Sequence, residues 1–306
     1  MPGNRCVCLS GFEGNNCQTV SDTARYRRCE VKLVGIDGNN QPANETINGE
    51  CIENVIITDF LLKSSFSRLN RIQRMEMNWE GYYHEPRDLP GTRPVYIARS
   101  DPGIIYASTN ITGPGVNMTF PCYDGRSGLE ASLTSKCTES QPVNLGVPHG
   151  YIYNISLYTI IGGHKEFKAT DNQGEYVKQI FTGLPANLIL QVTFDSQAPV
   201  HCLVDSRYEC ETQEDNILPP EPIFAGIDAT TDPDITFYWA GWYDDPAQIR
   251  DYVYTIWELQ YVNGTLAAVG PPNVRGTWTT GADYPSIKAS KPSLIRAVLN
   301  VTDYAG

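Results

Sequence analysis

The chain has 306 residues and a formal net charge of −12, and 41% of its residues are hydrophobic while 19% are charged. This length allows two or three domains, each large enough to bury a hydrophobic core. The longest basic run is Arg27–Arg28, so a nucleic-acid partner is not expected. No apolar stretch approaches the roughly 18 to 20 residues that a membrane-spanning helix needs, so no membrane-spanning segment is expected.

The first element is a cysteine-rich segment within residues 1–18. Residues 6–17 read C-V-C-L-S-G-F-E-G-N-N-C, which closely resembles the closing half of an EGF-like module. The resemblance implies that Cys8 pairs with Cys17. It also implies that Cys6 pairs with a cysteine in an absent first half, which would account for the odd total of nine cysteines. The alternative is a zinc site, for which a fourth ligand is lacking nearby.

Residues 19–28 are polar and patternless and are predicted to form a linker. Farther along, alternating segments bounded by Gly, Asn and Asp predict β-strands, for example Glu30 to Val34 and Arg74 to Trp79. The one candidate helix is Asp59 to Asn70, where apolar side chains line one face of a helical projection. The sequence therefore predicts an all-β fold with at most one short helix.

An internal repeat connects two of the predicted strands. Residues 75–86 and 235–246 align without gaps and share the pattern Trp-x-Gly-aromatic-Tyr-x-acid-Pro. The pattern predicts a strand that buries Trp79, or Trp239, between two sheets and then turns sharply at the acid-Pro step. Two copies predict two β-sandwich domains of common plan, and the alternative is a coincidence between two β-rich segments.

The second copy continues into residues 249–259, which contain I-x-x-Y-x-x-x-I. This order resembles immunoglobulin-like domains of the fibronectin-type-III kind. The resemblance implies a sandwich at residues 223–306 with a late strand at Leu294 to Thr302 and a turn at Asp303 to Gly306. We expect this domain to lack its last strand. Either the protein continues beyond the segment, or a strand from another copy completes the sheet as in donor-strand fibres.

The first sandwich is predicted to span residues 29–215 with an insertion, and a proline-rich connector follows at residues 216–222. Proximity in the sequence favours three more disulfides, although six cysteines allow fifteen pairings. The predicted pairs are Cys29–Cys51, Cys122–Cys137 and Cys202–Cys210.

Six N-glycosylation sequons indicate passage through the secretory pathway. Chance alone would place about two or three Asn-x-Ser/Thr triplets in a chain of this composition. No apolar signal region precedes Cys6, so we expect an internal or processed part of a longer extracellular precursor. The alternative is that the triplets are unmodified polar loops. The predicted glycan-bearing residues are Asn44, Asn110, Asn117, Asn154, Asn263 and Asn300.

The sequence predicts no catalytic set, cofactor or metal. Two acid pairs near aromatic residues are alternative glycosidase carboxylates, but both coincide with the turn of the repeat, where acids commonly bond to backbone amides. Three aspartates before the second repeat are candidate calcium ligands without a recognised loop spacing. These residues are Glu80 with Glu85, Asp244 with Asp245, and Asp228, Asp232 and Asp234.

The order of an EGF-like remnant followed by aromatic-rich β domains resembles the mastigoneme, or tubular flagellar hair, glycoproteins of stramenopile algae and related sexually induced surface proteins. The residues that carry this resemblance are Cys6 to Cys17 and the Trp-x-Gly segments at Trp79 and Trp239. It implies a structural subunit of an extracellular filament whose partners are copies of itself and covalent N-glycans. The alternative is a monomeric adhesion or carbohydrate-binding module of a cell surface or matrix.

Overall fold

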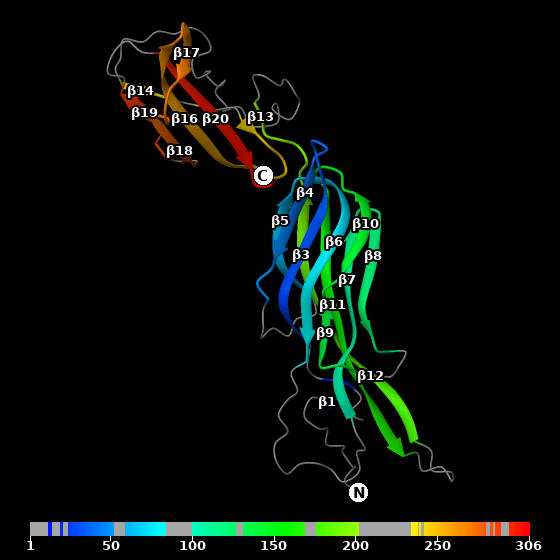
Figure 1. The fold of residues 1–306 in the computed structure, drawn as a ribbon. Coiled ribbons are helices and arrows are strands. Elements are labelled where there is room, and N and C mark those ends of the chain that lie inside the picture. Colours follow the sequence, from blue (N-terminus) through cyan, green and yellow to red (C-terminus); the bar gives the residue numbers. More distant parts are fainter. Residues whose placement is uncertain are drawn as a thin grey trace, which may run out of the picture. The chain divides into compact units, whose positions relative to one another are not determined.

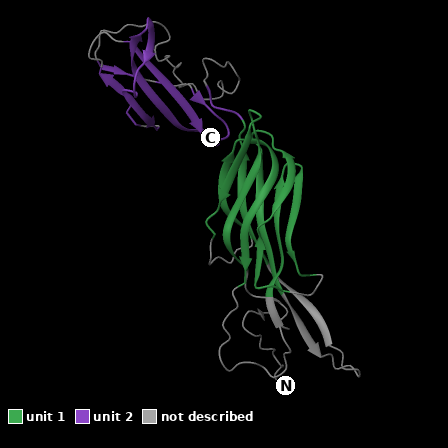
Figure 2. Ribbon diagram, in the orientation of Figure 1, with its two compact units in different colours: residues 1–196 green, residues 197–306 purple. Residues whose placement is uncertain are grey.

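The computed structural model describes residues 12–13, 19–20, 24–51, 59–83, 100–126, 131–168, 176–201, 234–237, 239, 242–279, 282–283, 285–288 and 294–306 (Figure 1). Every regular element among them is a β-strand, so the predicted all-β fold is confirmed. No helix in this part of the chain is long and apolar enough to cross a bilayer. The chain divides into unit 1, Met1–Ser196, and unit 2, Gln197–Gly306 (Figure 2).

Unit 1 is a sandwich of two sheets. Its described strands are β1 (Phe12–Glu13), β2 (Thr19–Val20), β3 (Arg25–Asp37), β4 (Pro42–Asn48), β5 (Asp59–Ser67), β6 (Leu69–Tyr82), β7 (Ser100–Gly113), β8 (Val116–Asp124), β9 (Thr134–Cys137), β10 (Ser140–Gly146), β11 (Ile152–Lys168) and β12 (Tyr176–Phe194). The first sheet has the order β10–β6–β3–β4, with β9 also paired to β6. The second sheet has the order β5–β12–β11–β7–β8. Its strands pair antiparallel except for β5, which lies parallel to β12.

Two segments of unit 1 differ from the prediction. Strand β3 begins at Arg25, inside the predicted linker, because Ala24 is buried and Tyr26 packs in the core, although Arg27 and Arg28 beside it are exposed. The predicted helix at residues 59–70 is wrong, since this segment forms β5 and the start of β6. Phe60 packs against the core while Leu61 is 51% exposed. Such alternation has the period of a strand rather than that of a helix.

Trp79 of β6 lies at the centre of the unit 1 core and is fully buried. Its Nε1 donates a hydrogen bond of 2.8 Å to the hydroxyl of Thr109 on β7, in the other sheet. Tyr26 packs 5.8 Å from the Trp79 ring, and its hydroxyl also crosses the core to Thr159 of β11 at 2.8 Å. Burial raises the pKa of Tyr26 above its usual value. The first repeat therefore places its tryptophan between two sheets, as predicted.

Unit 2 contains β13 (Val200–His201), β14 (Asp234–Thr236), β15 (Trp242–Tyr243), β16 (Ile249–Val262), β17 (Thr265–Ala268), β18 (Val274–Trp278), β19 (Ser286–Lys288) and β20 (Leu294–Asp303) among its described residues. Strand β16 pairs with β17, β18 and β20, while β14 pairs with β19 and β13 with β15. Trp239 of the second repeat is buried in the core of this unit, 5.4 Å edge-on to Trp278. The strand implied at Leu294 to Thr302 is present as β20.

The division between the two units follows Ser196, whereas the sequence placed the end of the first sandwich at residue 215. The predicted connector at residues 216–222 lies outside the described residues. The connector therefore stays a prediction.

Replacing Thr109 by valine keeps the shape of the side chain but leaves the buried Nε1–H of Trp79 without an acceptor. We expect Thr109→Val to lower the free energy of unfolding of unit 1 by about 1–3 kcal/mol. Urea denaturation of the full chain, followed by tryptophan fluorescence, measures the change. Thr193→Val, on the outer side of β12 beside buried Val192, is the matched control, with an expected change within about 0.5 kcal/mol. Equal losses in both variants would contradict a stabilising role for the Trp79–Thr109 bond.

Candidate functional site

All six sequon asparagines lie in the described part of the chain, and none of their side chains is buried. Four are exposed and two are half-buried. An N-glycan is bulky and must extend into solvent, so every one of these positions is compatible with modification. The exposed residues are Asn44, Asn117, Asn263 and Asn300, and the half-buried residues are Asn110 and Asn154.

Three of the sequons meet on the second sheet of unit 1, on strands β7, β8 and β11. Residues that pair directly across antiparallel strands point to the same face of a sheet, as do residues two apart along one strand. In the strand order β8–β7–β11, Thr119–Asn110–Ser156 form one row and Asn117–Thr112–Asn154 form the next. We call these six residues the sequon cluster. Each of its asparagines lies beside the hydroxyl residue of another sequon.

The middle residue of each clustered sequon points into the core. Ile111 and Ile155 are each 1% exposed, and Met118 packs against the same core cluster. Because side chains alternate along a strand, the Asn and the Ser or Thr of each sequon must then point outward. The sequon cluster therefore occupies the outer face of the second sheet.

Hydrogen bonds orient the two half-buried asparagines. The hydroxyl of Ser108 donates to Oδ1 of Asn110 at 3.0 Å, and Nε2 of Gln191 donates to Oδ1 of Asn154 at 3.4 Å. Within the described part of the chain, Nδ2 of either asparagine donates no hydrogen bond. Nδ2 is the atom that carries an N-linked glycan, so both attachment atoms remain available.

Two disulfides lie among the described residues, and both agree with the pairing expected from proximity. Cys29 of β3 joins Cys51, which follows β4. Cys122 of β8 joins Cys137 of β9, so this bond links the second sheet to the first. Cys137 is fully buried and pairs directly with Trp79 across the ladder. Cys8, Cys17, Cys202 and Cys210 lie outside the described residues, and their pairing stays a prediction.

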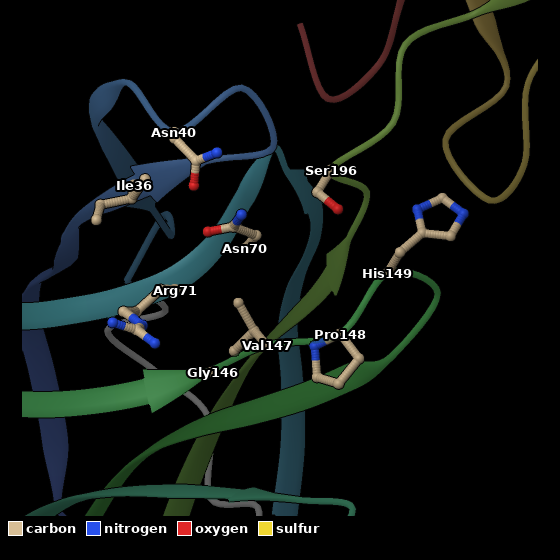
Figure 3. A pocket seen from close by; sticks show the side chains of 9 residues that line it. All are labelled: Ile36, Asn40, Asn70, Arg71, Gly146, Val147, Pro148, His149 and Ser196. Atoms are coloured by element: carbon tan, nitrogen blue, oxygen red, sulfur yellow. The ribbon is translucent and has the colours of Figure 1, made fainter.

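A pocket of about 490 Å³ lies at one end of unit 1 (Figure 3). Turns and strand ends that are far apart in the sequence form it. A Cβ atom added at Gly38 would overlap with the carbonyl oxygen of Ser196, so this glycine allows the β3–β4 turn to approach the end of β12. The lining residues are Ile36, Asn40, Asn70, Arg71, Gly146, Val147, Pro148, His149 and Ser196.

Two ionisable side chains line this pocket, and Figure 3 shows them toward opposite sides of it. Nδ1 of His149 lies 3.1 Å from Oδ1 of Asp195, whose side chain is fully buried. The guanidinium of Arg71 is exposed and makes no ion pair or hydrogen bond with another described residue. Sequence reasoning did not single out these residues, because they lie in separate turns without a motif spacing.

The acidic residues considered as alternatives do not form a recognisable site among the described residues. Asp244 is buried beside the exposed Asp245, and Asp234 lies 4.0 Å from Lys288. Glu85, Asp228 and Asp232 lie outside the described residues. Within the described ranges, no three His, Cys, Asp or Glu side chains are close enough together to hold a metal ion.

Comparison with known proteins finds no protein-family model, no curated protein and no solved structure that matches this chain. The fibronectin-type-III and mastigoneme resemblances therefore rest on sequence motifs alone.

Removing the bond between the sheets tests its contribution to stability. The double variant Cys122→Ser/Cys137→Ser opens a loop with a sequence separation of 15, for which the chain-entropy model gives about 3 kcal/mol. We expect a lower midpoint of guanidinium unfolding under non-reducing conditions. Reduction of the wild-type protein serves as the control and should lower its midpoint at least as far, because it also opens Cys29–Cys51. An unchanged midpoint in the double variant would contradict the prediction.

Proposed function

We propose that the protein is a structural subunit of an extracellular glycoprotein filament. The observation that carries this proposal is the edge of β20 in unit 2. Among the described residues β20 pairs only with β16, so its other edge has no partner strand there. The backbone N–H and C=O groups of such an edge can accept a strand from another chain.

The exposure of Ala297 on β20 supports strand addition at this edge. Ala297 pairs with Ile256 of β16, which is 1% exposed and belongs to the core of unit 2. Paired residues point to the same face, so Ala297 faces the core, yet its side chain is exposed. The core is therefore accessible along β20, and an added strand would bury apolar surface as well as pair its backbone.

The covalent features agree with an extracellular location. Disulfides persist in oxidising compartments, and two are present among the described residues. Accessible sequon asparagines allow a glycan coat. A strand donated head to tail does not close on itself and so generates a filament, which is the role that the mastigoneme-type resemblance implies.

Electron microscopy tests this proposal directly. Negative staining of protein purified from its native source without reduction should show regular filaments with a protomer-sized repeat.

In recombinant protein, Ala297→Lys places a charge on the inner side of the β20 edge and should abolish end-to-end association. Ala268→Lys, at an exposed position on β17, adds the same charge elsewhere and should leave association intact. Dispersed native particles, or filaments that persist in Ala297→Lys, would contradict the proposal.

A second candidate function is the binding of acidic carbohydrate in the pocket of unit 1. A planar guanidinium binds carboxylate or sulfate through two parallel hydrogen bonds, and Arg71 has no acidic partner among the described residues. The side-chain amides of Asn40 and Asn70 line the same pocket and can bond to sugar hydroxyls. This function would suit the adhesion or carbohydrate-binding module that is the alternative to a filament.

Calorimetric titration with a uronic-acid oligosaccharide tests this second function. We expect saturable binding that Arg71→Gln weakens by roughly tenfold or more, as loss of a charge-assisted bidentate contact implies. The matched control is Arg74→Gln, because Arg74 lies on the same strand outside the pocket, where it pairs with Glu76 at 2.7 Å. Absence of binding to the wild-type chain, or equal weakening in both variants, would exclude the pocket as the binding site.

A further inference from the structure

We propose that the sequon cluster is a single glycosylation site with three attachment points. In this site the glycans on Asn110, Asn117 and Asn154 shield one another from the mannosidases that trim oligomannose, and together they cover the outer face of the second sheet. This inference does not depend on filament formation. It follows from the pairing of β8, β7 and β11 and from the chemistry of N-linked glycans.

The spacing of the three attachment points is set by sheet geometry. Asn117 and Asn154 flank Thr112 on the two neighbouring strands, which places them two strand spacings, or about 10 Å, apart. Asn110 lies one strand over and two residues along from each of them, at about 8 Å. A branched glycan is far wider than these separations. Three occupied sites therefore produce one continuous carbohydrate layer rather than three separate chains.

Asn110 must be glycosylated before β7 pairs with β8 and β11. Asn110 is half-buried, with Thr119 paired on one side and Ser156 on the other. A transferase must take the sequon and its flanking backbone into its active site, and a strand that is hydrogen-bonded to neighbours on both sides cannot leave the sheet to enter it. The glycan on Asn110 is thus attached while β7 is still unpaired, and the neighbouring glycans are folded in beside it.

Crowding has a chemical consequence that distinguishes this cluster from separate sites. Trimming enzymes must reach the terminal mannoses of each glycan, and a neighbour about 8–10 Å away blocks their approach. The clustered glycans are therefore retained as oligomannose. Asn263 is exposed at the tip of the β16–β17 hairpin, with a φ of 51°, and its glycan is expected to be trimmed.

Site-specific glycopeptide mass spectrometry tests the proposal on the full chain secreted from cells that trim oligomannose. In the wild type, Asn110, Asn117 and Asn154 should all be occupied and carry oligomannose, while Asn263 carries trimmed glycan. Asn154→Gln should shift the glycans on Asn110 and Asn117 toward trimmed forms, because it opens one side of the cluster. Asn263→Gln is the matched control and should change none of the three.

If Asn154→Gln is not secreted, Thr119→Ala provides the same test. Thr119 is exposed on β8, and the substitution removes the sequon of Asn117 without changing an asparagine or the core. The glycans on Asn110 and Asn154 should then become more trimmed. An unoccupied site among the three, trimming equal to that at Asn263, or no response to removal of a neighbour would each overturn the proposal.

Discussion

The hydrogen bond from Trp79 to Thr109 is the interaction on which the arrangement of unit 1 depends. Apolar burial is non-directional, so it brings two sheets together without determining which residues of one sheet face which residues of the other. The buried N–H of Trp79 does determine this alignment, because leaving such a donor without its acceptor costs about 1–3 kcal/mol. The Cys122–Cys137 bond, beside Trp79 in the ladder, fixes the same alignment covalently. A slip of one residue in β7 would turn Ile111 outward and Asn110 into the core, so the sequon cluster depends on this alignment too.

Much of this architecture could be predicted from the sequence, because alternation and the tryptophan repeat are local patterns. Both predicted core tryptophans are buried, and β20 lies where the motif placed it. The sequence predicts a helix at residues 59–70 because the apolar residues there fit one face of a helix as well as one face of a strand. The segment forms a strand because it pairs in parallel with β12, which lies far away in the sequence. The β3 start was missed because Tyr26 is a single apolar residue among arginines. Each sequon was visible, but their shared face depends on the register of β7 with β8 and β11, which composition does not reveal.

The two units divide the proposed roles between them. The sequon cluster lies on the outer face of the second sheet of unit 1, whereas strand addition would take place at β20 of unit 2. Asn300 also lies on β20, but it pairs with Val253, whereas its neighbour Leu299 packs against the core. A glycan on Asn300 would therefore project from the outer face of the sheet and leave the edge of β20 accessible. Glycosylation and strand addition are compatible on the same strand.

Because β5 pairs in parallel with β12, β5 is synthesised long before the strand that it pairs with. Asp59 of β5 bonds to Asn187 of β12, 128 residues later in the chain. At the usual pace of translation, β5 therefore waits on the order of ten seconds for its neighbour. During that interval its apolar side chains and backbone groups lie open to chaperones and to other nascent chains. In a chain secreted as proposed, β12 is the last strand of the second sheet to be made, so that sheet is still incomplete when Asn110 and Asn117 become accessible to the glycosylation machinery.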